Sequence, residues 1–72
     1  MIKEAGITVI HDAERSMTTL TDWAHDQVFE LDHDDSIDAA QIERRMWRAY
    51  ALGGTAGLLG CFGAEHIRLL PA

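Results

Sequence analysis

Residues 37–52 read IDAAQIERRMWRAYAL, and this stretch carries the strongest secondary-structure signal in the sequence. Its apolar residues recur at steps of three and four, which places them on one face of a helix and the polar residues on the other. The apolar face consists of Ala39, Ile42, Met46, Ala49 and Tyr50. The polar face consists of Gln41, Arg44, Arg45 and Arg48. The pattern predicts a helix over 37–52, with Asp35 or Ser36 as its N-cap.

The preceding segment, 13–31, shows a weaker period of the same kind. Its apolar stripe consists of Met17, Leu20, Ala24, Val28 and Leu31. Phe29 falls on the opposite side of this expected helix, either buried under another element or exposed for contact. The polar residues 32–36 form a short turn, and a short turn between two amphipathic helices predicts an antiparallel helical hairpin.

Short segments with strand character lie outside the two expected helices. Residues 6–10 are rich in β-branched types, and residues 65–70 roughly alternate polar and apolar side chains. We expect these terminal strands to pair, which gives a β-α-α-β order. The fold class is therefore α+β, mostly helical, in one small domain over residues 1–72.

Between the second helix and the last strand, residues 49–64 carry no charge and contain five of the six glycines. Gly53 and Gly54 are expected to end or kink the second helix. Small residues allow close backbone packing, within one chain or between two copies. A chain this short has little core of its own, so we expect a homodimer.

The composition excludes several function classes. The 72 residues contain 12 acids and six Lys or Arg, and the net charge of −6 argues against direct binding to nucleic acid or an anionic membrane. One cysteine cannot form an internal disulfide, and no secretory signal opens the chain, so we expect a cytoplasmic protein. No motif indicates a reaction or a cofactor, and we do not expect an enzyme.

The acids are segregated, because residues 16–43 contain eight of them and neither Lys nor Arg. On a helix, Asp22, Asp26 and Glu30 would form a row with a rise of about 6 Å per step. That spacing is within a factor of two of the phosphate spacing of a DNA strand, about 3.4 Å. The row therefore suits a basic partner, although a merely solubilising surface would also be acidic. The expected contact residues are Asp22, Asp26, Phe29, Glu30, Asp32, Asp34, Asp35, Asp38 and Trp47.

Arg44, Arg45 and Arg48 form a basic cluster beside Trp47. They either pair with acids of the turn and Glu43 or make a second contact surface, because Arg and Trp are enriched at interface hot spots.

In size and charge, and in having no enzyme motif, the chain is similar in general character to phage-encoded inhibitors of host defence, such as anti-CRISPR proteins and other nucleic-acid mimics. This resemblance implies an acidic interaction protein that inhibits or regulates a larger partner by covering its basic surface, including one that normally grips nucleic acid.

Two other functions stay open. Residues 30–43 resemble a degenerate EF-hand, with Asp32, Asp34, Ser36 and Glu43 at loop positions 1, 3, 5 and 12 but Ile37 where glycine is needed. Transition-metal binding by His25, Asp26 and His33 is a related possibility. The second open function is that of a structural subunit of a larger assembly, which would dock through its glycine-rich segment.

Overall fold

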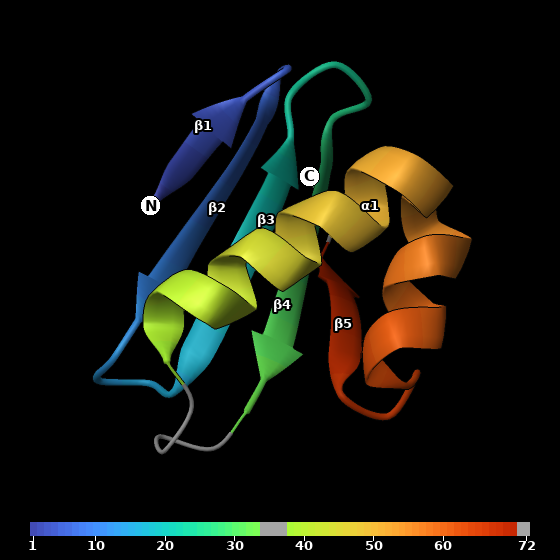
Figure 1. The fold of residues 1–72 in the computed structure, drawn as a ribbon. Helices are drawn as coiled ribbons and strands as arrows, with labels where there is room; N and C mark the ends of the chain where they lie inside the picture. The colour runs from blue at the N-terminus through green and yellow to red at the C-terminus, as the bar shows by residue number, and fades with distance from the viewer. Residues whose placement is uncertain (34–37, 71–72) are drawn as a thin grey trace.

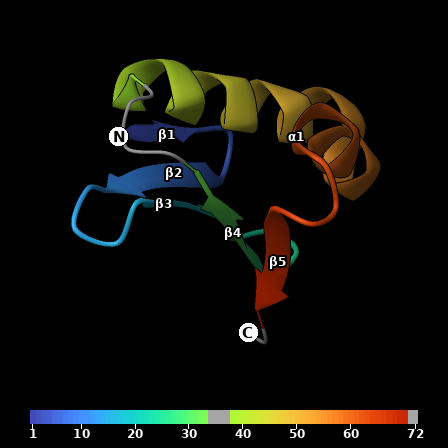
Figure 2. The same cartoon turned by 90° about the horizontal axis from the view of Figure 1, so that it is seen from below.

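The computed structural model describes residues 1–33 and 38–70. Five antiparallel strands form one sheet in the order β1-β2-β3-β4-β5, and one long helix crosses a single face of it (Figure 1). The elements are β1 (Ile2–Glu4), β2 (Ile7–Asp12), β3 (Met17–Asp22), β4 (Gln27–Asp32), α1 (Ala39–Phe62) and β5 (Ile67–Leu70). Seen from below, helix and sheet form two layers, and the other face of the sheet is open (Figure 2).

The predicted helical hairpin is wrong. The expected helix over 13–31 is instead the β3–β4 hairpin with the turns around it, so the fold is a β-rich α+β arrangement with one helix. Threonines 18, 19 and 21 lie in β3, where β-branched side chains pack well against neighbouring strands.

Two matching turns shape the β2–β3 and β3–β4 hairpins. The Asp12 carboxylate accepts hydrogen bonds from the N–H groups of Glu14 and Arg15, at 3.1 and 3.3 Å. Ten residues later, the Asp22 carboxylate accepts from the N–H groups two and three positions on, at 3.1 and 3.2 Å. Each turn ends on a residue with positive φ, Ser16 at 51° and Asp26 at 56°. These local bonds are those of Asx turns, and they reverse the chain after each strand.

The expected terminal strands exist as β2 and β5, but they do not pair with each other. β2 lies between β1 and β3, and β5 pairs only with β4. Strands β3 and β4 therefore separate β2 from β5.

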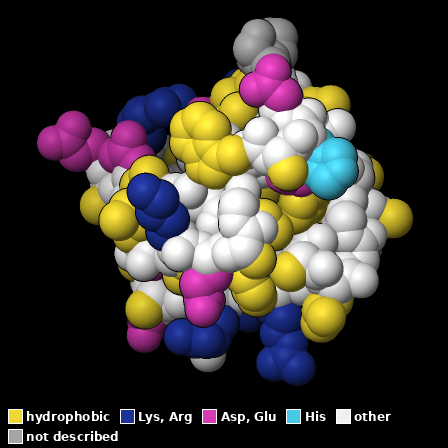
Figure 3. All heavy atoms as spheres, turned by 90° about the horizontal axis from the view of Figure 1, so that it is seen from above, with side chains coloured by type: hydrophobic (Ala, Val, Ile, Leu, Met, Phe, Trp, Pro, Cys, Tyr) yellow, Lys and Arg dark blue, Asp and Glu magenta, His cyan; other side chains and the backbone are white. Residues whose placement is uncertain are grey.

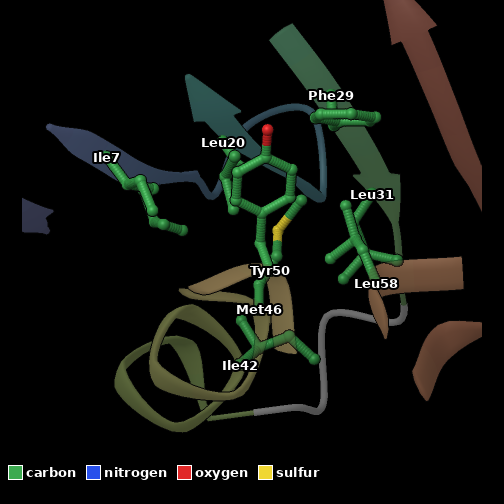
Figure 4. Packing of buried hydrophobic residues seen from close by; sticks show 9 residues of the cluster. Ile7, Leu20, Phe29, Leu31, Ile42, Met46, Tyr50 and Leu58 are labelled. Atoms are coloured by element: carbon green, nitrogen blue, oxygen red, sulfur yellow. The ribbon is translucent and has the colours of Figure 1, made fainter. Parts of the chain in front are cut away.

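The core lies between the sheet and α1 (Figure 4). Side chains alternate between the faces of a strand, so register partners share a face. The row of Val9, Leu20 and Phe29 faces the helix, and these three residues are at most 1% exposed. The helix contributes Ile42, Met46, Tyr50 and Leu58.

The helix predicted over 37–52 is confirmed for the part that the structure describes. It begins after Asp38, whose carboxylate accepts from the N–H of Ala40 at 3.0 Å. The expected caps Asp35 and Ser36 lie outside the described residues. None of the described helices is long and apolar enough to span a bilayer.

The expected kink is also present, at Gly54, where φ is 62° and ψ is −150°. Only glycine adopts this conformation readily. Beyond the kink, α1 folds back so closely that a Cβ on Gly57 would lie 2.6 Å from the carbonyl oxygen of Ala49. The small residues thus allow close packing within one chain.

Candidate functional site

The row of acids expected on a helix does not exist. Asp22 lies on the helix-covered face of the sheet and is 4% exposed, whereas Glu30 lies on the open face and is 7% exposed. Asp26 lies in the turn between β3 and β4. Because neighbouring side chains in a strand point to opposite faces, the helical spacing of four carries no meaning at these positions. The phosphate-like row is therefore a misreading.

Asp22 is instead the buried centre of a polar cluster that includes Tyr50 of α1. It accepts hydrogen bonds from the Tyr50 hydroxyl at 2.5 Å and from Nδ1 of His25 at 2.8 Å. Oε1 of Gln27 lies 3.2 Å from the same hydroxyl. Burial raises the pKa of Asp22, but these hydrogen bonds outweigh it and leave the pKa below its ordinary value. Burial and the bond to Asp22 raise the pKa of Tyr50 to about 12. This arrangement holds α1 on the sheet.

The other expected contact residues are dispersed. Phe29 belongs to the core at 1% exposure, as the burial alternative predicts, and Trp47 is half-buried, with Nε1 donating to the carbonyl oxygen of Glu4 at 3.1 Å. Asp38 caps α1, and Asp32 is exposed at the end of β4. Residues 34 and 35, the remaining two, lie outside the described residues.

No continuous acidic surface covers the end of the molecule that includes the β3–β4 turn. Figure 3 looks down on this end and shows acidic, basic and hydrophobic side chains interspersed, with Lys and Arg toward the rim.

The open face of the sheet carries a hollow of about 110 Å³ beside the β4–β5 pair. Its volume exceeds the roughly 30 Å³ share of one water molecule several-fold. The lining residues are Met17, Glu30, Asp32, Glu65, His66, Ile67 and Arg68. The hollow therefore combines three carboxylates with the apolar side chain of Met17.

The sheet register builds this hollow. Met17 and Asp32 are paired residues of β3 and β4, and Glu30 pairs with Arg68 across β4 and β5. The chain reaches Glu65 just before β5, where the N–H of Asp32 donates to the carbonyl oxygen of His66 at 3.0 Å. Residues from three separate strands thus meet at one end of the sheet.

The three carboxylates differ in how far they are already neutralised. Glu30 is held by Nη2 of Arg15 at 3.1 Å, and Nη1 of Arg68 lies 4.0 Å from it. Glu65 is 75% exposed and lies 3.8 Å from Nε2 of His66. The Asp32 carboxylate has no partner within 1–33 and 38–70. Within the described residues, no Lys or Arg therefore pairs with the Asp32 and Glu65 carboxylates at this rim.

Two further acids extend the negative potential along this end of the sheet. Asp12 and Asp32 flank Met17 in one row of the open face, two strand spacings or about 9.6 Å apart. Glu14 is exposed in the adjoining β2–β3 turn. A basic surface would meet acids on both sides of Met17.

Histidines gather on the other side of the same sheet end. The Thr18 hydroxyl lies 3.2 Å from Nδ1 of His11 and 2.8 Å from Nε2 of His33, and the two rings stack with centroids 5.0 Å apart. Beside His33 is a second hollow of about 330 Å³, whose lining includes Cys61 and His66. We find no chemistry in this arrangement that identifies a ligand.

The helix-loop-helix framework of the expected EF-hand is wrong, and metal binding itself stays a prediction. Where the first helix of the expected EF-hand would lie, the chain forms the β3–β4 hairpin, and His25 and His33 lie just beyond opposite ends of β4. Residues 34–37 of the expected loop lie outside the described residues. Across the described ranges, no three His, Cys, Asp or Glu side chains are grouped to hold a metal ion.

Comparison with known proteins adds no family to this picture. No protein-family model, no curated protein and no solved structure matches the chain.

Sequence reasoning missed Glu65, His66 and Arg68 as site residues. The alternating pattern of 65–70 predicted a strand, and β5 (Ile67–Leu70) is that strand. Its pairing with β4, which brings these residues to Asp32, has no local signal in the sequence.

Proposed function

We propose that this chain is a small interaction protein that regulates a larger partner by covering a basic surface on it. The observation that carries the proposal is the hollow on the open face, where Glu65 is exposed and the Asp32 carboxylate has no ion-pair partner among the described residues. In this proposal, a lysine or arginine of the partner places its stem against Met17 and its charged head group at the rim. Charge-assisted hydrogen bonds are about twice as strong as neutral ones.

The charge balance at this site supports a cationic ligand. Arg15 and Arg68 both form ion pairs with Glu30, so a single carboxylate is the partner of two guanidinium groups. Asp32, Glu65 and the neighbouring Asp12 and Glu14 add negative charge without further Lys or Arg in the hollow. This potential steers a basic partner toward the open face and excludes an acidic one.

The cytoplasm is part of the proposal as the place of action, and the free thiol of Cys61 is compatible with a reducing compartment. Inhibition as the form of regulation, homodimer formation and a role as a structural subunit stay predictions.

Capture from host lysate with three forms of the chain tests the proposal. The forms are the wild type, the double variant Asp32→Lys/Glu65→Lys, and Glu4→Lys/Asp26→Lys, which makes the same change in charge at exposed acids outside the hollow. We expect the wild type and the control to retain a common partner that the first variant loses. Melting curves of all three establish that each is folded. A partner retained equally by all three would refute the proposed site.

A further inference from the structure

The outward side of α1 carries a second charged surface, of opposite sign to the hollow. Arg44, Arg45 and Arg48 are exposed, and none of them forms an ion pair with a residue in the described ranges. Of the acids expected to pair with them, residues 34 and 35 of the turn lie outside the described residues, and Glu43 points to the sheet. It accepts from the backbone N–H of His11 at 3.0 Å and from the amino group of Met1 at 3.1 Å.

The three arginines surround exposed apolar surface. Arg44, Arg48 and Leu52 are spaced four residues apart and therefore form one ridge along the helix, and Leu52 is 78% exposed. One hollow of about 320 Å³ lies beside this ridge toward Trp47 and Ala51. Another, of about 240 Å³, lies on its Arg45 side and extends to Cys61 beyond the kink. A ridge between two hollows is the surface into which another helix packs.

This surface is not explained by the stability of the helix. Arg44 and Arg48 stand one turn apart, and like charges at this spacing destabilise a helix by about 0.2–0.5 kcal/mol. Glu43 is the one acid between Ala39 and Phe62, and it lies on the other side. Arg45 is held in place, with Nη2 3.7 Å from Sγ of Cys61 and its guanidinium 5.4 Å from the Phe62 ring centroid.

We propose that this outward side of α1 binds an acidic amphipathic helix of a partner protein. The helix places acids against Arg44 and Arg48 and apolar side chains in the two hollows beside Leu52. Charge complementarity selects an acidic partner, and the apolar hollows select an amphipathic helix over a simple polyanion. Since α1 covers one face of the sheet and the acidic hollow lies on the other, the chain has two contact surfaces of opposite charge on opposite layers.

The test uses a synthetic helical peptide with glutamates and leucines on one face, titrated into isotopically labelled full-length chain. We expect amide shifts concentrated at residues 44–52 and around Cys61. The double variant Arg44→Glu/Arg48→Glu is expected to weaken binding about tenfold or more, since it replaces two attractive pairs by repulsive ones. Leu52→Ala is expected to weaken it severalfold, because it removes apolar contact area.

Two controls make the result specific. Lys3→Glu/Arg68→Glu makes the same charge change away from α1, and Asp32→Lys/Glu65→Lys disrupts only the acidic hollow. Both are expected to bind the peptide within about twofold of the wild type, so this surface and the proposed function can fail separately. Each variant is first shown to be folded by its amide spectrum.

Several outcomes would overturn the inference. They are equal binding by Arg44→Glu/Arg48→Glu, shifts centred on the sheet, and equal binding of a peptide with lysine in place of glutamate. Two other outcomes would also overturn it by pointing to a different occupant of this surface. One is binding to phosphatidylserine vesicles without binding to the peptide. The other is a dimer in sedimentation that excludes the peptide and that Arg48→Glu dissociates.

Discussion

The kink of α1 predicts opposite effects for two neighbouring glycine substitutions. Gly53 has ordinary helical geometry, whereas Gly54 has φ 62° and ψ −150°. A Cβ added at either position meets no atom within 4 Å, so backbone conformation is the difference between them. Gly53→Ala is expected to stabilise the chain by about 0.5–1 kcal/mol, because alanine loses less conformational freedom on folding. Gly54→Ala is expected to destabilise it by about 1–3 kcal/mol, because an L-residue is strained there.

Urea denaturation followed by circular dichroism measures both free energies of unfolding in the same buffer. The two variants should differ by about 1.5–4 kcal/mol, and each kcal/mol should shift Tm by about 4–8 °C in a domain of this size. If Gly54→Ala were as stable as Gly53→Ala, the helix would continue straight through this position, and the packing of its second half on the sheet would be wrong.

Three further predictions concern the core. Tyr50→Phe should destabilise the chain by about 1.5–3 kcal/mol in urea denaturation, because it removes a hydrogen bond to the buried Asp22 carboxylate; a change under about 0.5 kcal/mol would contradict the cluster. The stability should also depend on pH at both ends of the range. The lowered pKa of Asp22 stabilises the fold above about pH 4, and this contribution is lost as the pH falls further. The pKa of Tyr50, raised from 10.0 to about 12, stabilises the fold below pH 10, and this contribution is lost as the pH rises from 10 to about 12. Denaturation midpoints across pH should show the alkaline loss in the wild type and not in Tyr50→Phe. Leu58→Ala should cost about 2–5 kcal/mol because Leu58 is 0% exposed in the core, while the exposed Leu52→Ala should change stability by less than about 0.5 kcal/mol.

The sequence predicted the described part of the helix over 37–52 correctly because its buried face is almost wholly apolar. The sequence pattern did not reveal the β3–β4 hairpin, because polar residues occupy several of the positions that face the helix. Thr18, Asp22 and Gln27 alternate with Leu20 and Phe29 on the helix-covered face, so the period of two is not visible as alternating hydrophobicity. Meanwhile Met17, Leu20 and Leu31 happen to match a helical step.

One signal does distinguish the two interpretations. Asp12 and Asp22 are each followed four positions later by a residue that tolerates positive φ, Ser16 and Asp26, at an interval of ten. Because an Asp that caps a helix and an Asp that closes a turn both accept from N–H groups two or three positions on, the residue alone cannot decide. The repeat of the whole pattern on either side of a threonine-rich segment favours hairpins.

The candidate site was only partly accessible to sequence reasoning. Asp32 was among the expected contact residues, and its exposure is consistent with that role. Glu65 and Arg68 reach it across a helix of 24 residues, through the pairing of β5 with β4. Asp22 and Glu30 were expected at the surface, but each is buried against partners that come from other elements, Tyr50 for the first and Arg15 and Arg68 for the second. Pairings between residues so far apart in the sequence depend on the tertiary structure.

The most direct test of the acidic hollow is the affinity of the captured partner for two charge-matched variants, measured by calorimetry at about 50 mM salt, where surface charges are weakly screened. We predict that Asp32→Lys/Glu65→Lys binds the partner at least about tenfold more weakly than the wild type, a difference of about 1.4 kcal/mol. Glu4→Lys/Asp26→Lys should bind within about twofold of it. Equal weakening by both variants would show that only net charge matters and would contradict a site at the hollow.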